Sequence, residues 1–435
     1  MVSAALAIRL LFAPTLAYDF DIWGWGTVIQ NMDSGNDLYQ VAGYYYTPVW
    51  GYIVGSMTVF QDLMGPDLWG VRSEALLGME GLAWPYHTAN TMSTGFLVFI
   101  KIPLIACDMA VAYLIHWLVR DRTGDGRKAV FAVALWLMCP IAVYMSGIQA
   151  QFDTVSALFM LLTAIAFYKD RCLLGGALLS AAILLKFFPF FCILVILAYV
   201  WGRHRRDGAH IKKVATAITG MAAMGAILIL PQILNGTLMD AFSFALARAG
   251  ASVNVLVTIS NWGGAAVALL GMIYFALRMA RHEGEDRDSS YFENLLLALA
   301  AAVFVSLTPQ YVIVMLPLLI LRLATHERRM IVPWALISVG SFMNALALNN
   351  FSLFTSAAEF LGLVSPEWAL AGMQSMDATF LGVMAFIWIA GIAIFLECIG
   401  LLAIFAIVFR KAGAPAKRPP WRKVWRSGAE GSDEV

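Results

Sequence analysis

The sequence predicts an all-α polytopic membrane protein, and three observations lead to this fold class. Of its 435 residues, 61% are hydrophobic and 13% are charged, whereas soluble domains contain about 45–50% apolar and about 25% charged residues. The apolar residues form runs long enough for one or two helices each, because one span needs roughly 20 residues. Basic residues gather between these runs, as in the cytoplasmic loops of membrane proteins.

The expected spans follow one another along the whole chain. They are the apolar runs at about 2–17, 95–119, 129–147, 153–168, 172–202, 213–231, 253–278, 291–308, 311–323, 331–348 and 379–409. The composition excludes a disordered chain, which needs low hydrophobicity and high charge. It also argues against a nucleic-acid partner, because 29 basic residues nearly balance 28 acidic ones and the basic residues are scattered.

Basic clusters between the runs predict the orientation of the chain. These clusters are Arg120, Arg122, Arg127 and Lys128; Lys169 and Arg171; Arg203, Arg205, Arg206, Lys212 and Lys213; Arg278, Arg281 and Arg287; and Arg322, Arg328 and Arg329. All five clusters, and the basic tail, are expected in the cytoplasm. The stretches 172–202 and 291–323 have such clusters at both ends, so each is predicted to be a hairpin of two short helices.

Residues 18–94 are expected to form one large extracytoplasmic loop. The run 2–17 starts inside and the run 95–119 ends inside, so the apolar stretch 48–63 cannot be a single crossing. It is predicted to lie in the interface or to dip in and out as an in-plane helix. The expected organisation is about twelve spans in one membrane domain, residues 1–410, with a late outer loop at 349–378 and a basic cytoplasmic tail at 411–435.

Polar residues gather at the predicted outer turns, where ionisable groups are costly and indicate function. They are Asp19, Asp21, Gln149, Gln151, Asp153, Lys186, Gln310 and Tyr311. A carboxylate can take a proton from a hydroxyl, and a lysine can meet a phosphate as a point charge. The set therefore suits a reaction between a lipid phosphate and a hydroxyl at the outer surface.

Each of these residues also has a structural alternative. Asp19 and Asp21 can be solvated charges at a helix end, and Asp153 can be a helix N-cap. Lys186 can extend its ammonium group to the interface, and Gln310 after a proline can be turn chemistry.

Arg9, Asp108 and Glu397 are ionisable residues that fall inside apolar runs. Arg9 is expected to pair with an acid inside the bundle, although the sequence does not identify the acid. Asp108 and Glu397 are expected to be structural hydrogen-bond partners.

Six short motifs occur in a recognisable order. They are Tyr18-Asp19-Phe20-Asp21-Ile22-Trp23, Gly35 with Leu38-Tyr39, Tyr46-Thr47-Pro48-Val49-Trp50, Gln151-Phe152-Asp153, Lys186-Phe187-Phe188-Pro189 and Thr308-Pro309-Gln310-Tyr311. Their order resembles the integral-membrane glycosyltransferases of the GT-C superfamily, and within it the prokaryotic mannosyltransferases related to GPI mannosyltransferases. One departure is that glycine and glutamine do not directly precede the x-Asp pair, so the resemblance assigns no role to Gly147 and Gln149.

The resemblance implies an inverting glycosyltransferase of the plasma membrane, with both termini cytoplasmic and its active site outside. The donor would be a polyprenyl-phosphate-linked sugar, expected to be mannose, and the acceptor a hydroxyl of a glycolipid or lipid-linked glycan. The implied base is Asp19 or Asp21. The implied substrate-binding residues are Gln151, Asp153, Lys186 at the carrier phosphate, Gln310 and Tyr311 at the donor-pocket rim, and Tyr39. No cofactor is required, and a divalent metal is neither indicated nor excluded.

Two other functions remain open at this point. A lipid or sugar transporter or flippase is one alternative, but transporters often show inverted repeats and midplane sites, and this chain has no clear repeat. A non-catalytic subunit of a glycosylation complex is the other.

Overall fold

The structure is a computed structural model. It describes residues 1–14, 16–17, 19–40, 44, 46–60, 71–72, 91–92, 94–240, 255–284, 286–359 and 383–412, together with isolated positions between 365 and 380. Helices make up nearly all of this part, in agreement with the predicted fold class. The described residues also include two antiparallel pairs of two-residue strands. β1 (Val71–Arg72) pairs with β2 (Thr91–Met92), and β3 (Thr379–Phe380) pairs with β4 (Val383–Met384).

Six of the described helices are long and apolar enough to cross a membrane. They belong to α6 (Thr94–Thr123), α12 (His210–Leu234), α14 (Val255–Ala280), α15 (Arg287–Ser306), α17 (Ile331–Glu359) and α19 (Ala385–Ala412). A seventh candidate is a bent pair, α7 (Gly126–Leu137) and the helical stretch Pro140–Gln149, with a 56° bend between them. The chain is thus an α-helical polytopic membrane protein, while the total of about twelve spans stays a prediction.

Shorter apolar helices occupy the other predicted runs. They are α1 (Val2–Phe12), α9 (Asp153–Tyr168), α10 (Cys172–Leu185), α11 (Ile193–Arg203) and α16 (Leu316–Thr325). The 3₁₀-helix η3 (Phe188–Cys192) joins α10 to α11, and η4 (Pro309–Val314) joins α15 to α16. Both predicted breaks, at Lys186 and before Pro309, are therefore confirmed.

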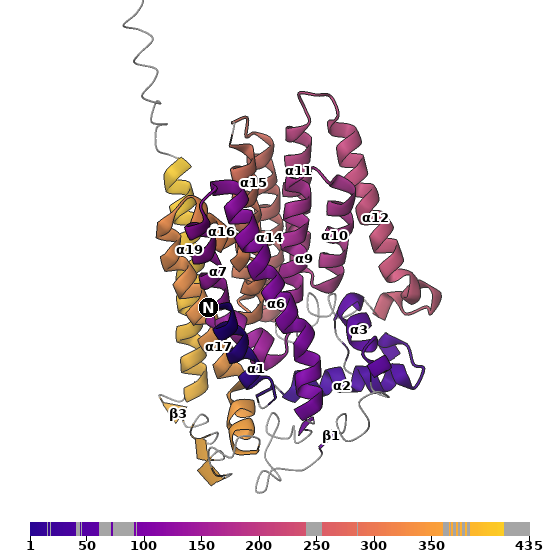
Figure 1. Cartoon of the computed structure of the whole chain (residues 1–435), viewed down its shortest axis with the longest axis vertical. Coiled ribbons are helices and arrows are strands. Elements are labelled where there is room, and N and C mark those ends of the chain that lie inside the picture. Colours follow the sequence, from indigo (N-terminus) through magenta and orange to yellow (C-terminus); the bar gives the residue numbers. More distant parts are fainter. Residues whose placement is uncertain are drawn as a thin grey trace, which may run out of the picture.

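Part of the predicted loop 18–94, called the first outer region from here on, folds at one end of the bundle. It contains α2 (Asp19–Asp33), η1 (Leu38–Gln40) and α3 (Pro48–Gly55). Figure 1 shows α2 running crosswise to the long helices at their lower end. The Tyr52 hydroxyl donates to the Gln232 side chain at 2.7 Å, which ties α3 to the last turns of α12.

The first part of the predicted late outer loop is helical. Helix α17 continues to Glu359, beyond the candidate span that ends at Ala347, so residues 349–359 extend this helix. This stretch contains neither glycine nor proline, so nothing in its local chemistry stops the helix where the apolar run ends. The rest of the predicted loop falls largely outside the described residues, as does the tail beyond Ala412.

The five basic clusters meet at the opposite end of the bundle. Ion pairs with acidic residues connect neighbouring clusters. Lys169 lies 3.0 Å from Asp121, and His204 and Lys213 both contact Asp170. Arg203 lies 3.5 Å from Asp288, and Arg278 and Arg322 each lie 2.5 Å from one oxygen of Glu293. The turn between α11 and α12 and the end of α19 lie at this upper end in Figure 1. The clusters therefore share one side of the molecule, as the sequence predicts.

The turn between α9 and α10 shows how charge is balanced at this end. Burial pulls the pKa of the Asp170 carboxyl upward, but hydrogen bonds from Lys213 and His204 outweigh it and hold the pKa below its ordinary value. The Arg203 guanidinium also donates to the Tyr168 carbonyl at 2.9 Å. The start of α10 and the end of α11 therefore lie side by side at this end of the bundle, as expected for a helical hairpin.

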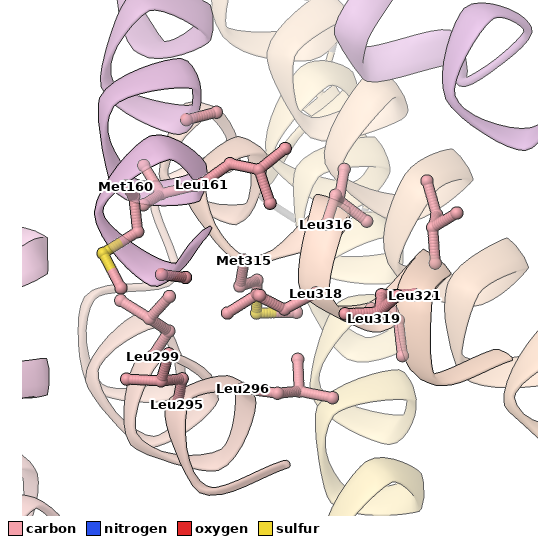
Figure 2. Close-up of a cluster of buried hydrophobic side chains, with 14 of the residues drawn as sticks. Met160, Leu161, Leu295, Leu296, Leu299, Met315, Leu316, Leu318, Leu319 and Leu321 are labelled. Carbon is pink, nitrogen blue, oxygen red and sulfur yellow. The ribbon is translucent and has the colours of Figure 1, made fainter. Parts of the chain in front are cut away.

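The core lies where α9, α15 and α16 pack together. Figure 2 shows Met160 and Leu161 of α9 facing Leu295, Leu296 and Leu299 of α15, with residues of α16 beside them. These side chains are almost fully buried. Side chains packed at this density hold the helices in fixed positions, so the polar residues at their ends have fixed positions too.

Candidate functional site

Proline interrupts the helices at the end of the bundle where α2 lies, and it places polar residues in the breaks. Thr47, before Pro48, and Thr308, before Pro309, both have extended backbones. The ring of a proline disfavours the helical conformation in the preceding residue. Lys186 is also extended, and Pro189 follows it at the start of η3.

A fourth helix break, at the same end of the bundle, contains no proline and instead follows a π-helix. The segment Tyr144–Gln149 (η2) is a π-helix, and Ala150 after it has the left-handed backbone conformation with φ of 60°. π-helical turns are uncommon and frequently occur at functional sites. The Trp25 indole donates to the Ala150 carbonyl at 3.3 Å and thereby fixes α2 against this turn.

Asp21 is buried against two glutamines of this turn. Its side chain lies on the first turn of α2 and is 6% exposed. The Gln151 amide donates to Oδ2 of Asp21, and the Gln149 amide approaches the same oxygen at 3.5 Å. Both amide contacts are to Oδ2, so the two glutamines hold the same oxygen of the carboxylate.

Burial has a large effect on this carboxyl group. Removal from water raises the pKa of Asp21 to about 7, against the lowering effect of Gln151, Gln149 and the Lys186 charge. A carboxylate with a pKa near neutrality is a stronger base than an exposed one. Asp21 is therefore poised to exchange a proton near physiological pH.

Lys186 and Asp153 form a buried ion pair beside Asp21. The Lys186 ammonium donates to Oδ1 of Asp153, and the two residues are 7% and 0% exposed. The ammonium also lies 4.7 Å from the ring centre of Tyr311 and 4.9 Å from that of Phe152. Cation–π contacts of this kind hold a desolvated cation in place. Three predicted residues, Asp153, Lys186 and Tyr311, are thus brought together from α9, the α10–η3 break and η4.

An aromatic cluster joins this ion pair to the first outer region. The Phe152 ring stacks on Trp50 at 4.9 Å and meets Tyr46 edge-on at 5.2 Å. Trp25 contacts both Trp50 and Phe152, at 5.6 Å and 5.9 Å. Large rings packed in this way exclude water, which strengthens the electrostatic interactions beside them.

Several buried polar atoms at the site have no hydrogen-bond partner among the described residues. They are Oε1 of Gln149, Oε1 of Gln151, Oδ2 of Asp153 and Nε1 of Trp50. Orphaned buried polar atoms are uncommon and costly, so they point to a partner such as water or a bound ligand. Three of the four are acceptors, which a ligand carrying several hydroxyl groups would satisfy.

The other predicted site residues lie around this centre. The Tyr39 hydroxyl donates to the Tyr46 carbonyl at 2.9 Å, which places Tyr39 behind the aromatic cluster rather than beside Asp21. Burial raises the pKa of its phenol well above the ordinary value, so it stays neutral. Gln310 is half-buried beside Tyr311. Helix α2 begins at Asp19, whose side chain lies outside the described residues.

The structure also decides among some of the structural alternatives. Asp153 is the first residue of α9 rather than its N-cap, which is Phe152. Lys186 does not extend to the interface, because its ammonium is held inside by Asp153. Arg9 does pair with an acid inside the bundle, and that acid is Asp108.

Sequence reasoning assigned no specific role to two residues that shape the site. Gln149 contacts Asp21 although the resemblance assigned it no role. Lys101 of α6 is fully buried and donates to the Ala13 carbonyl at 2.9 Å and to the Leu16 carbonyl, just before α2 begins. The signal was available for Lys101, since it is a cation inside an apolar run and such cations commonly satisfy helix C-terminal carbonyls.

No group of three or more His, Cys, Asp or Glu side chains suited to a metal ion occurs among the described residues. Among the described side chains, Asp21 and Asp153 bring two carboxylates to the site, and Lys186 forms an ion pair with the second. The residues of the site thus provide general-base and electrostatic chemistry of their own.

Comparison of the chain with protein-family models and with curated proteins gave no match. Its chemistry must therefore be argued from its own residues. These combine an α-helical membrane bundle with a buried polar cluster at the end opposite the basic clusters.

Proposed function

We propose that the protein is an inverting glycosyltransferase that moves a sugar, mannose by resemblance, from a polyprenyl-phosphate carrier to a hydroxyl group. The acceptor is a glycolipid or a lipid-linked glycan. The observation that carries the proposal is the position of a buried carboxylate of raised pKa, Asp21, beside the buried ion pair of Lys186 and Asp153, at one end of a membrane bundle. A general base and a phosphate ligand side by side are what transfer from a sugar phosphate needs.

The reaction is a single displacement. Asp21 takes the proton of the acceptor hydroxyl, and the oxygen attacks the anomeric carbon of the lipid-linked sugar. The new bond joins that oxygen to the anomeric carbon, and the bond from the anomeric carbon to the phosphate oxygen breaks. Lys186 stabilises the charge on the departing phosphate, with Tyr311 and Phe152 holding the ammonium in place.

The lengths of the helices around the site support a lipid-borne donor. Helix α10 has 14 residues and starts at the end of the bundle that carries the basic clusters. At 1.5 Å per residue it reaches about 21 Å, whereas the hydrocarbon core of a membrane is about 30 Å thick. Lys186 at its end would therefore lie at the depth of the outer leaflet, where the phosphate of a lipid carrier can reach it.

The orphaned polar atoms support a sugar as the transferred group. Gln149, Gln151 and Asp153 each keep one buried acceptor oxygen that has no partner in the described part of the chain. Sugar hydroxyls donate hydrogen bonds to such oxygens, and a site that leaves them unpaired favours a substrate that pairs them. The neighbouring indole rings of Trp25 and Trp50 would add an apolar surface beside the sugar.

The proposal includes an orientation. The basic clusters and both termini would face the cytoplasm of a cell whose plasma membrane contains the protein, and the site would face outward. An even number of spans, about twelve as expected from the sequence, would place both termini on the same side. Helices α2 and α3 would then lie in the outer interface. Residues of the late outer loop would contribute to acceptor selection.

A transfer assay tests the proposal. Purified full-length protein receives radiolabelled polyprenyl-phosphate mannose together with a glycolipid extract, and lipid products are separated. We expect a labelled product that Asp21→Asn abolishes and that Asp33→Asn, at the exposed far end of the same helix, leaves unchanged. Asp19→Asn identifies the contribution of the second acid. Binding of the donor without transfer in any extract would instead indicate a flippase or a non-catalytic subunit.

A further inference from the structure

Behind the candidate site lies a second buried polar network, formed by α1, α6 and the π-helix. Arg9 and Asp108 are both 0% exposed, and the Arg9 guanidinium donates to Oδ2 of Asp108. Arg9 also donates to the carbonyls of Ala5 at 3.0 Å and Leu137 at 3.2 Å. A buried ion pair adds little stability compared with apolar packing, but it can specify one arrangement of the surrounding elements.

The π-helix is attached to this ion pair through Ser146. The Ser146 hydroxyl lies 3.0 Å from Oδ2 of Asp108, the same oxygen that Arg9 contacts, and 3.0 Å from the Ala142 carbonyl. Gly147 lets α1 approach closely, because a β-carbon there would lie 3.2 Å from the Arg9 Cα atom. Ser146 and Gly147 together set both the rotation and the distance of the π-helix relative to α1.

The same segment continues directly into the glutamines that contact Asp21. The backbone N–H of Gln151 donates to the Met145 carbonyl at 3.0 Å, so the turn that carries Gln151 is tied to the residue before Ser146. The Gln151 side chain then donates to Asp21. An unbroken series of contacts thus runs from Asp108 through Ser146 and the π-helix to the carboxylate of Asp21.

We propose that Asp108 and Ser146 are positioning residues: they fix the register of the π-helix, and through it they aim the Gln149 and Gln151 amides at Asp21. The proposal rests on the proposed function only for the role of Asp21 as the base. The contacts themselves do not depend on what reaction follows. Among the described residues, the side chains of Asp108 and Ser146 bond to each other, to Arg9 and to the Ala142 carbonyl, rather than to the residues expected to touch substrate.

The proposal has a measurable consequence at Asp21. The groups facing Asp21 are Gln149 and Gln151 from the turn, Asp153 from α9 and Lys186 from the α10–η3 break. The two amides lower the pKa of Asp21, partly offsetting the effect of burial. Loss of their alignment must therefore raise the pKa of Asp21 further, whereas loss of fold stability alone would not change it in this direction.

Carbodiimide labelling measures this without any substrate. Hydrophobic carbodiimides modify protonated carboxyl groups in membrane proteins, so labelling of Asp21 across a pH series gives its titration midpoint. Purified full-length protein is labelled in lipid nanodiscs and digested, and fragment-ion masses separate Asp21 from Asp19 on one peptide. We expect Ser146→Ala to raise the midpoint by up to about 1–2 units, because the loss of a hydrogen bond to an ionised carboxylate shifts its pKa by about that much. Gly147→Ala should raise it as well.

Ser338→Ala is the matched control. Ser338 is also fully buried and also bonds to the carbonyl four residues earlier, at 2.6 Å, but its other contact is Cys139 rather than Asp108. It should leave the midpoint unchanged. An unchanged midpoint in Ser146→Ala, with the protein folded, would overturn the proposal.

A double-variant comparison tests the route of the effect. In a Gln149→Ala/Gln151→Ala background, Ser146→Ala should cause no additional shift, because the amides through which it acts are gone. A full additional shift in that background would also overturn the proposal. If the wild-type protein transferred no sugar but the labelling shifts were present, the proposed function would fail and the positioning role would stand.

Discussion

Gln151 follows Asp21 by 130 positions in the chain, yet its amide donates a hydrogen bond to the Asp21 carboxylate inside the folded protein. This contact joins α2 to the turn that follows the π-helical end of the bent pair and precedes α9. It stabilises the ionised form of a carboxyl group whose burial favours the neutral form. The balance between these two effects determines how Asp21 can act as a base.

The first prediction concerns the pH dependence of transfer. Burial raises the pKa of Asp21 to about 7, and only the ionised carboxylate can accept the acceptor proton. The value of kcat/KM should therefore increase as the pH rises through about 7 and level off above it. Asp33→Asn should keep this profile. A rate that is flat through neutrality would mean that Asp21 is not the base.

The second prediction is that Asp21→Asn stabilises the protein at alkaline pH. The pKa of Asp21 is higher in the folded state, about 7, than its ordinary value of 3.8. The contribution of Asp21 to the free energy of unfolding is therefore fully favourable below about pH 4, and it is lost as the pH rises to about 7. The upper limit of the loss is about 4 kcal/mol, at about 1.4 kcal/mol per unit. Thermal unfolding in detergent should show a higher Tm for Asp21→Asn above pH 7 and no difference in acid.

The third prediction separates the structural and chemical roles of Lys186. Lys186→Gln leaves the Asp153 carboxylate buried without its cation, so the Tm should fall. Transfer should also fall, by roughly 100-fold or more, because a preorganised charge beside the leaving group is worth about 3 kcal/mol. Adding Asp153→Asn removes the unpaired charge and should restore the Tm but not the activity. Recovery of both in the double variant would show that Lys186 only compensates Asp153.

The fourth prediction compares two acids inside long helices. Asp108 is paired with Arg9, so Asp108→Asn leaves a buried cation unpaired and should cost about 3–5 kcal/mol. Glu397 is equally buried, but no cation contacts it among the described residues. Glu397→Gln should therefore change stability by less than about 1 kcal/mol. The free energies of unfolding of the two variants should be measured by denaturation in the same detergent. Equal losses of stability would contradict this prediction.

Local patterns in the sequence were sufficient for much of this architecture. Apolar runs located the helices, and charge at both ends of 172–202 predicted the break that the structure has at Lys186. The grouping of Asp153, Lys186 and Tyr311 followed from their shared sidedness.

Other features depend on contacts that no local pattern encodes. The π-helix at Tyr144–Gln149 and the left-handed Ala150 bring both Gln149 and Gln151 to Asp21. A regular helix would have placed these two glutamines on different faces. The partner of Arg9 could not be identified either, because Asp108 lies 99 positions away and the choice between buried acids depends on how the helices pack.

The fifth prediction tests the orientation of the molecule in the membrane. Ser34, between α2 and η1, and Arg206, between α11 and α12, are both exposed and lie at opposite ends of the bundle. The native cysteines in the described chain are buried or half-buried, so introduced ones should dominate labelling. A membrane-impermeant maleimide should label Ser34→Cys in intact cells and Arg206→Cys only after permeabilisation. The reverse pattern would place Asp21 and Lys186 in the cytoplasm, on the side of soluble nucleotide sugars, and would remove the reason for a lipid-linked donor.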